Sequence, residues 1–272
     1  MTQMRKVSDG CENITTPSHE EDAGISKFLF ELASNRRVSI LFEIEKQNLK
    51  MQQIAKALDM NVTETFRHLQ RLSQSKLVEK KVDGTYAITS LGTLAIGFLS
   101  SLDFILKNGD YFLEHDLSCL PYEFVNRLGE LSNGEFCGNT VTHFNRVREM
   151  VYEADEYIWA MAEQVESSHI QATNEKVSKG LQFRFIMQQE LAKTVMIAPE
   201  IEHLKERRWL ERICVTFLIN EKESVVNFRR LDGQMDYIGF FGKDERFRKW
   251  TRDLFMYCWE RAERWHPSSR SP

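Results

Sequence analysis

The stretch that most constrains the fold of this 272-residue chain is residues 61–78, NVTETFRHLQRLSQSKLV. Asn61 and Glu64 form an N-x-x-E capping box, in which the Asn side chain accepts from a free helical amide and the Glu reaches back. At helical spacing, one face is mainly apolar and the other is polar. The mainly apolar face consists of Val62, Thr65, Leu69 and Leu72. The stretch therefore predicts a helix over 61–75 with one buried face.

A hairpin is predicted directly after this helix. The pair Asp83-Gly84 separates LVEKK from TYAIT, and Asp-Gly favours a type I′ turn because both central positions need positive φ. Before the helix, apolar residues at helical spacing predict three further helices. These helices are expected over 25–33, 34–46 and 51–58. Because Ile54 and Leu69 can meet across a tight turn, the order of elements predicts a winged helix-turn-helix over 25–92.

The exposed face of helix 61–75 carries groups suited to reading DNA. The arginine fork matches the two acceptors that guanine presents in the major groove, so we expect Arg67 and Arg71 to read bases. The wing, residues 77–89, would neutralise phosphates through Lys80 and Lys81. Phe66, at the boundary of the two faces, is either a core residue or a contact for a thymine methyl group. The full set of expected DNA contacts is Gln52, Thr63, Phe66, Arg67, Gln70, Arg71, Lys80 and Lys81.

Charge supports this expectation only modestly. Residues 26–92 carry 11 Lys and Arg against 7 Asp and Glu, a balance of +4, whereas the whole chain has a net charge of −4. A split of this kind between segments indicates nucleic-acid contact in the basic part. The alternatives without a DNA-binding role are a solvated helix face for the arginines and a solubilising hairpin edge for the lysines.

The apolar run over 91–106 is shorter than the roughly 20 residues that a membrane span needs, and Asp103 interrupts it. We therefore expect a buried helix at a domain or subunit junction and no membrane anchor. Together with the following segment it forms a predicted linker and dimerisation region over 93–134. Contacts of the dimer are expected at Leu94, Ile96, Phe98 and Leu99.

An α/β sensing domain is predicted over 135–265, between polar, disordered tails at 1–24 and 266–272. Strands are expected in YIWAMA (157–162), LQFRFIM, ICVTFLI, SVVNFRRL and MDYIGFF, and a long amphipathic helix follows from Asp244. The charged segment PEIEHLKERRW is expected to be helical. Aromatic residues of this region form a core or the wall of an effector pocket. The candidate effector-binding residues are Trp159, Trp250 and Trp259.

No catalytic or metal-ligating motif stands out in the sequence, which lacks a His-x-x-x-His pair, a G-x-S-x-G elbow and a Gly-rich phosphate loop. The five cysteines are scattered without metal-site or redox-motif spacing, which indicates reduced thiols in a cytoplasmic protein. His203-Leu204-Lys205 is similar to the His-x-Lys core of phospholipase D enzymes, but Leu210 replaces the expected aspartate. We therefore predict no enzyme activity, no cofactor and no metal.

Several segments resemble known regulators. LFEL (29–32), RHLQRL (67–72), KLVEKK (76–81) and SLG (90–92) look like the ArsR-type winged-helix domain of archaeal transcription regulators. YFLEHDLSCLP (111–121), LGELS (128–132), EADEYIWAMAEQ (153–164) and the segment 244–262 resemble the archaeal methanogenesis regulatory protein family. The resemblance implies a dimeric DNA-binding regulator. Its second domain would be similar to the sensor domain of TrmB-like regulators, which resembles a catalytically silent phospholipase D fold. The chain departs from the family at Thr65, where an apolar residue is usual, and at Phe66, where a small polar residue is usual. These departures concern DNA sequence preference rather than binding mode.

Taken together, the sequence predicts an α+β protein, with an N-terminal winged helix-turn-helix followed by the α/β sensing domain. The expected partners are double-stranded DNA, a second copy of the chain and a small-molecule effector. Two alternatives stay open. One is a phospholipase D-like hydrolase fused to a DNA-binding domain, and the other is a winged helix that binds protein.

Overall fold

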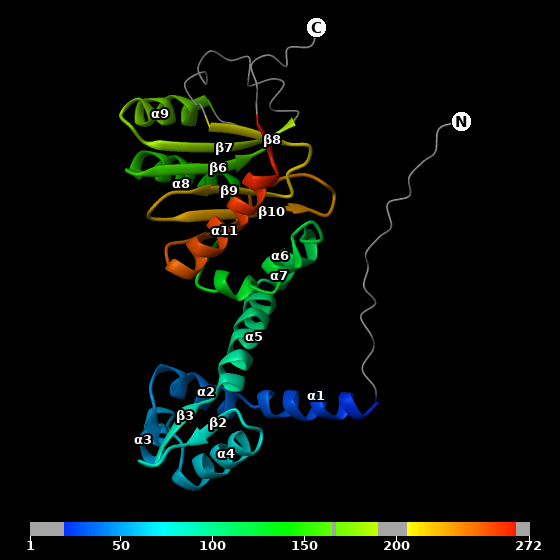
Figure 1. Cartoon of the computed structure of the whole chain (residues 1–272), viewed down its shortest axis with the longest axis vertical. Helices are drawn as coiled ribbons and strands as arrows, with labels where there is room; N and C mark the ends of the chain where they lie inside the picture. Colours follow the sequence, from blue (N-terminus) through cyan, green and yellow to red (C-terminus); the bar gives the residue numbers. More distant parts are fainter. Residues whose placement is uncertain (1–18, 165–166, 190–205, 265–272) are drawn as a thin grey trace, which may run out of the picture. The chain divides into compact units, whose positions relative to one another are not determined.

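The structure, a computed structural model, describes residues 19–164, 167–189 and 206–264. The chain divides into two compact units, residues 1–97 and 98–272 (Figure 1). The long helix α5 (Ser90–Lys107) begins in the first unit and ends in the second.

The N-terminal unit is a winged helix-turn-helix, as predicted. Three short strands form an antiparallel sheet in the order β1-β3-β2, and helices precede and interrupt it (Figure 1). The elements are α1 (His19–Leu32), α2 (Asn35–Lys46), β1 (Leu49–Lys50), α3 (Met51–Ala57), α4 (Val62–Gln74), β2 (Val78–Lys80) and β3 (Thr85–Ile88). The two-residue strand β1 was not predicted, and α1 begins inside the range expected to be a tail.

The core of this unit explains why α3 and α4 meet at a fixed angle. Ile54 of α3 and Leu69 of α4 are both fully buried in one apolar cluster, which confirms the expected contact across the turn. Asp59 in that turn has φ +50, a left-handed conformation that Asp adopts more readily than most residues. Val62 departs from the prediction because it is half exposed. It occupies the first position of α4, before the helix reaches the core.

The wing turn also differs from the prediction. Gly84 has φ +81, but Asp83 is not in the left-handed region, so the turn is not type I′. The Gly84 amide donates to the Lys81 carbonyl at 3.0 Å, and the Lys81 amide donates to the Thr85 carbonyl at 2.8 Å. This pattern is a three-residue loop closed by a glycine in the left-handed conformation. Compared with the predicted two-residue turn, this loop has one more residue, Val82, which is fully exposed.

The C-terminal unit is built on one mixed sheet. Its strand order is β12-β8-β7-β6-β9-β10-β11-β5, and β4 pairs with β10. Strands β6, β7 and β8 are parallel to one another, and the remaining pairs are antiparallel. The strands are β4 (His115–Asp116), β5 (Glu135–Cys137), β6 (Tyr157–Ala162), β7 (Gln182–Gln188), β8 (Glu206–Leu210), β9 (Val215–Ile219), β10 (Ser224–Arg230), β11 (Gly239–Gly242) and β12 (Glu263–Arg264).

Helices cover both faces of this sheet. Helix α11 (Glu245–Arg261) lies across one face, and α8 (Thr140–Glu153) lies on the other (Figure 1). Alternation along β10 separates the two layers, because Val226 packs on the α11 side and Val225 on the α8 side. The other helical segments of the unit are α6 (Gly109–Glu114), α7 (Tyr122–Val125), the 3₁₀ turn η1 (Leu128–Leu131) and α9 (Ser167–Ser178). The predicted α/β architecture is therefore confirmed.

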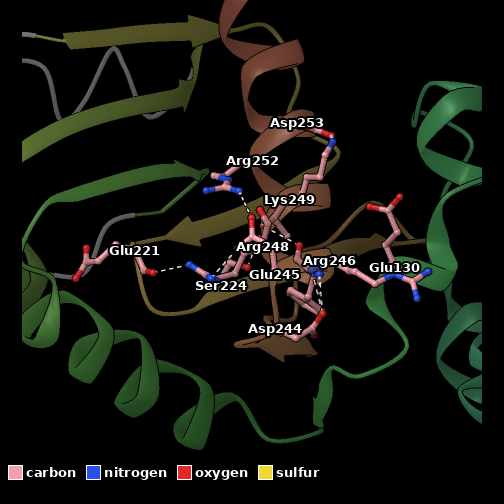
Figure 2. Close-up of polar contacts among 12 residues, drawn as sticks. Glu130, Glu221, Ser224, Asp244, Glu245, Arg246, Arg248, Lys249, Arg252 and Asp253 are labelled. Atoms are coloured by element: carbon pink, nitrogen blue, oxygen red, sulfur yellow. Dashed lines mark hydrogen bonds and ion pairs between the residues drawn. The ribbon is translucent and has the colours of Figure 1, made fainter. Parts of the chain in front are cut away.

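Polar contacts fix the start of α11 on its sheet face (Figure 2). Asp244 accepts from the amides of Arg246 and Phe247 and so caps the helix, which satisfies donors that have no partner inside a helix. Arg248 donates to the Glu221 carbonyl in the loop between β9 and β10. Thr251, fully buried, donates to Ser224 of β10 at 2.9 Å. These contacts hold α11 against the central strands.

Three segments of the second unit differ from the prediction. Residues 206–210 form β8 rather than a helix, and the Arg208 side chain lies over the Trp259 ring. The strand expected from Met235 begins only at Gly239, where an added Cβ would lie 2.2 Å from the Val226 carbonyl oxygen. The segment YFLEHDLSCLPYEF (111–124), expected to be linker-like, contains most of α6 and the strand β4. His203, Leu204 and Lys205 lie outside the described residues.

Candidate nucleic-acid interface

The start of α4 is fixed by half of the predicted capping box. The Asn61 side chain accepts from the Glu64 amide at 2.7 Å. Glu64 does not complete the box: its carboxylate lies 3.6 Å from His68 Nε2 and 4.0 Å from Arg36 Nε. Thr65 is fully buried, and its hydroxyl donates to the Asn61 carbonyl at 2.9 Å. The buried hydroxyl is thereby satisfied in a position where an apolar residue was expected.

The opposite face of α4 is open to solvent. Thr63, Arg67 and Gln70 are exposed along it, at spacings that place them on one side of a helix. Phe66 is 50% exposed, so the structure excludes it from the core. Within the described part of the chain, the Arg67 side chain makes no hydrogen bond or ion pair. Its guanidinium can therefore reach a ligand without breaking a contact.

Arg71 is placed differently from Arg67. It donates two hydrogen bonds to the Glu31 carboxylate, from Nε at 3.0 Å and from Nη2 at 2.6 Å. Its guanidinium carbon also lies 5.1 Å from the centre of the Phe30 ring. The Glu31 hydrogen bonds raise the pKa of Arg71 further above its ordinary value. The structure thus ties Arg71 to α1, and reading a base would require this pair to open.

The wing presents two lysines with different surroundings. Lys80 lies 6.0 Å from the centre of the Tyr86 ring, whereas Lys81 pairs with Glu79 at 2.5 Å. Both lysines are exposed. At the tip, Asp83 accepts from the Thr85 hydroxyl and amide, and these bonds lower the pKa of Asp83. Lys80 therefore carries the less compensated positive charge.

Two residues of the neighbouring helices complete this surface. Gln52 is exposed near the start of α3. Arg36 of α2 was missed by the sequence interpretation. Its side chain is 53% exposed and donates to the Leu58 carbonyl at 3.3 Å, at the end of α3. Nothing in the sequence distinguished Arg36 from a solvated helix residue, because its position depends on how α2 and α3 pack.

The three tryptophans expected to bind an effector lie on the α11 side of the sheet. Trp250 is fully buried, and its indole N–H donates to the Phe124 carbonyl at 3.1 Å. The rings of Trp159 and Trp259 stack on Phe255 with centroid distances of 5.3 and 5.8 Å. These contacts are those of a packed core.

The residues expected at a dimer interface fall into two groups. Leu94 and Phe98 are 62% and 65% exposed, and Leu99 is partly buried. Ile96, in contrast, is 3% exposed and belongs to the core of the winged helix. Its predicted role at an interface is therefore wrong, because its side chain points to the opposite side of α5 from Leu94 and Phe98.

By length and composition, α5 could cross a membrane, and 22% of it is buried. The core helices of many water-soluble proteins meet the same criteria. Here Ala95 and Ile96 pack into the winged-helix core, and Phe104 packs into the core of the second unit. These contacts account for part of the apolar character of the helix.

No protein-family model matches the chain, and no curated protein matches it. Among solved structures, it is similar to TrmBL2, an archaeal chromatin protein, with 15% identity over 89% of this chain and 99% of that chain and a TM-score of 0.42. It is also similar to the homodimeric winged helix-turn-helix domain of Mb0332 from Mycobacterium bovis. That match has 23% identity over 35% of this chain and 92% of that chain, with a TM-score of 0.29.

A third similarity is to Nuc, a phospholipase D family member from Salmonella typhimurium. That match has 7% identity over 45% of this chain and 90% of that chain, with a TM-score of 0.37. At TM-scores below 0.5, none of these likenesses carries a functional assignment. The winged helix-turn-helix is established by the element order, sheet register and core of the chain itself.

Proposed function

We propose that the chain is a DNA-binding transcription regulator in which α4 enters the major groove. The observation that carries this proposal is Arg67, an exposed arginine without a partner among the described residues, on the outer face of the second helix of a helix-turn-helix. In this motif the second helix lies in the major groove with its outer residues against base edges. A free guanidinium there matches the two acceptors of guanine.

The neighbouring residues have supporting roles in this proposal. Thr63 and Gln70 are exposed on the same face and can donate to bases or phosphates. Phe66, half exposed, would contact a thymine methyl group. Lys80 and Lys81 of the wing and Gln52 of α3 would contact the backbone. Arg71 contributes mainly by holding α1, since its fork is engaged by Glu31.

The proposal also includes assembly, location and regulation. A single winged helix contacts few base pairs, so a dimer reading two half-sites about one DNA turn apart gives selectivity. The exposed apolar side chains of α5, Leu94 and Phe98 among them, would form part of that interface. The protein would act in the cytoplasm, and its C-terminal unit would bind an effector that favours one arrangement of the paired winged helices.

DNA selection tests the central claim. A pool of random duplexes is selected on the full-length protein, and affinity for the selected site is then measured by fluorescence anisotropy. Arg67→Ala should lose about 1–3 kcal/mol of binding free energy and relax base preference at one position. Lys46→Ala is the matched control, because Lys46 is an exposed cation at the end of α2. Unchanged affinity of Arg67→Ala at moderate salt would contradict the proposed recognition helix.

Two other outcomes would indicate a different function for the chain. Salt-insensitive binding to a protein, with no affinity for any selected duplex, would make the winged helix an interaction module. Hydrolysis of a phosphodiester that disappears in His203→Ala would indicate a phospholipase D-like enzyme. All three measurements use the same purified full-length protein, so the three functions can be compared directly.

A further inference from the structure

A cavity of about 110 Å³ lies inside the C-terminal unit, between the sheet and the helices α8 and α9. It is on the opposite face of the sheet from Trp250 and Trp259. Its wall is mostly apolar and includes Val147 of α8, Ala160 of β6 and Phe185 of β7. An engineered apolar cavity of roughly 150 Å³ holds a benzene molecule. The space is of the same order of size, so a single compact ring is the largest body that it suits.

Two buried oxygen atoms in the wall residues lack a protein partner. Among the described residues, neither Asn227 Oδ1 nor the Tyr237 hydroxyl has a hydrogen bond, although these residues are only 2% and 7% exposed. The other half of the Asn227 amide is satisfied, because Nδ2 donates to Thr216 Oγ1 at 3.0 Å. Buried polar atoms in native proteins nearly always find a partner. Such a pair of atoms indicates a bound group that supplies the missing contacts.

Tyr237 is also held in an unusual backbone conformation. Its φ of +57 lies in the left-handed region, which is uncommon for an aromatic residue and often marks a functional position. The ring packs beside Phe144, with centroids 4.9 Å apart, and near His143. Burial raises the pKa of Tyr237, so the hydroxyl stays protonated and able to donate. The conformation and the packing thus hold Tyr237 as a fixed residue of the cavity wall.

The wall limits the charge of a ligand. None of the described side chains that line the cavity is Lys, Arg, Asp or Glu. An ion would lose its hydration there without a charged partner in the wall. The charges that act on the Tyr237 hydroxyl, those of Glu163 and Arg229, are already paired with each other. A neutral hydroxyl group, in contrast, offers both a donor, as Asn227 Oδ1 requires, and an acceptor, as the Tyr237 hydroxyl requires. The aromatic side chains Phe144, Phe183 and Phe185 favour a flat apolar body.

We propose that this cavity binds a small, uncharged, phenol-like molecule through Asn227 and Tyr237, and that it is the effector site of the C-terminal unit. Only the regulatory part of this statement rests on the proposed function. Helix α8 and strands β6, β7, β9 and β10 all contribute to the wall, so a ligand that favours one packing of these elements can shift the unit between arrangements.

Calorimetric titration of the full-length protein, without DNA, tests the site. Phenol is the probe, and benzene, which lacks the hydroxyl, is the matched ligand. Tyr237→Phe removes one oxygen and should weaken phenol about three- to tenfold while leaving benzene unchanged. Tyr152→Phe is the control variant, because Tyr152 is 57% exposed on α8 and does not line the cavity. Ala160→Leu, which fills the space, should weaken both ligands.

The possible results distinguish failure of the cavity proposal from failure of the proposed function. Absence of phenol binding at millimolar concentration would overturn the inference, and so would equal affinities for phenol in the parent and in Tyr237→Phe. Circular dichroism checks that each variant is folded, and Tyr237→Phe decides the question even where Ala160→Leu does not fold. Phenol binding in a protein with no DNA affinity would support the cavity and contradict the regulator. A change of operator affinity on adding phenol would support both.

Discussion

The guanidinium of Arg71 in α4 and the carboxylate of Glu31 in α1 form a two-point hydrogen-bonded pair across 40 residues of sequence. The Glu31 side chain is only 9% exposed, and Arg37 Nε lies 3.1 Å from the same carboxylate. Arg37 also donates to the Glu31 and Phe30 carbonyls at 2.6 Å each. One buried acid thus links three helices of the winged-helix unit.

Glu31→Gln is expected to destabilise the protein by about 2–4 kcal/mol, because it leaves Arg37 buried without its counter-charge. Arg71→Ala should also lower stability, by less, since Arg71 is partly exposed. Arg67→Ala should leave stability unchanged within about 0.5 kcal/mol. Urea denaturation followed by circular dichroism measures all three. Equal stability of Arg67→Ala and Arg71→Ala would contradict the different roles assigned to the two arginines.

The wing lysines are expected to differ in their effect on DNA affinity. Lys80→Ala should reduce the slope of log K against log salt by about 0.9, the value for one phosphate contact on duplex DNA. Lys81→Ala should reduce it less, because Glu79 already compensates the Lys81 charge. Anisotropy titrations between 50 and 200 mM salt, roughly the range in which such slopes are measured, give both values. The Lys46→Ala variant should keep the parental slope, and a larger effect for Lys81 than for Lys80 would count against this view of the wing.

Dimer formation is expected to depend on the exposed side of α5. Leu94→Glu or Phe98→Glu would place a charge in the apolar interface and should raise the dimer dissociation constant by about tenfold or more. Thr93→Glu is the matched control, because Thr93 is exposed on the same helix and its own side chain is already polar. Sedimentation velocity at micromolar concentration measures the effect. A parent protein that remains a monomer, with and without DNA, would refute the proposed dimer.

Local signals explain why the winged helix could be predicted from sequence. The Asn61 cap and the spacing of Leu69 and Leu72 are properties of a few adjacent residues, and the structure confirms them. The pairing of Glu31 with Arg71 could not be predicted, because it depends on the angle at which α1 meets α4. The same holds for the half-formed capping box, since Glu64 turns instead towards Arg36 and His68.

The C-terminal unit shows a second reason for failure. Residues 206–210, ERRWL, have the composition of an exposed helix, yet they pair with β7 and β12. Arg208 covers apolar surface with its long side chain, since its guanidinium carbon lies 4.3 Å from the Trp259 ring centre. The cavity beside Tyr237 likewise could not be predicted from the sequence, because residues of separate strands and helices form its wall.

The thiol of Cys214 is expected to be more acidic than the thiols of Cys119 and Cys258. A hydrogen bond from Cys119 lowers the pKa of Cys214 to about 7, and the charges of Arg212 and Arg229 add to the effect. The same contact raises the pKa of Cys119, and burial raises that of Cys258 to about 12. Because the thiolate is the reacting form, alkylation of Cys214 by iodoacetamide should reach half its maximal rate near pH 7.

Peptide mapping by mass spectrometry after timed labelling between pH 5 and 9, a range of about two units on either side of that value, follows each cysteine separately. Cys119→Ala removes the hydrogen bond and should move the Cys214 midpoint towards the ordinary thiol value near 8.5. Cys137→Ala, which removes a buried thiol that bonds to the Asn139 carbonyl instead, is the matched control and should leave the midpoint in place. A Cys214 midpoint that is the same in the parent and in Cys119→Ala would show that the two thiols do not interact.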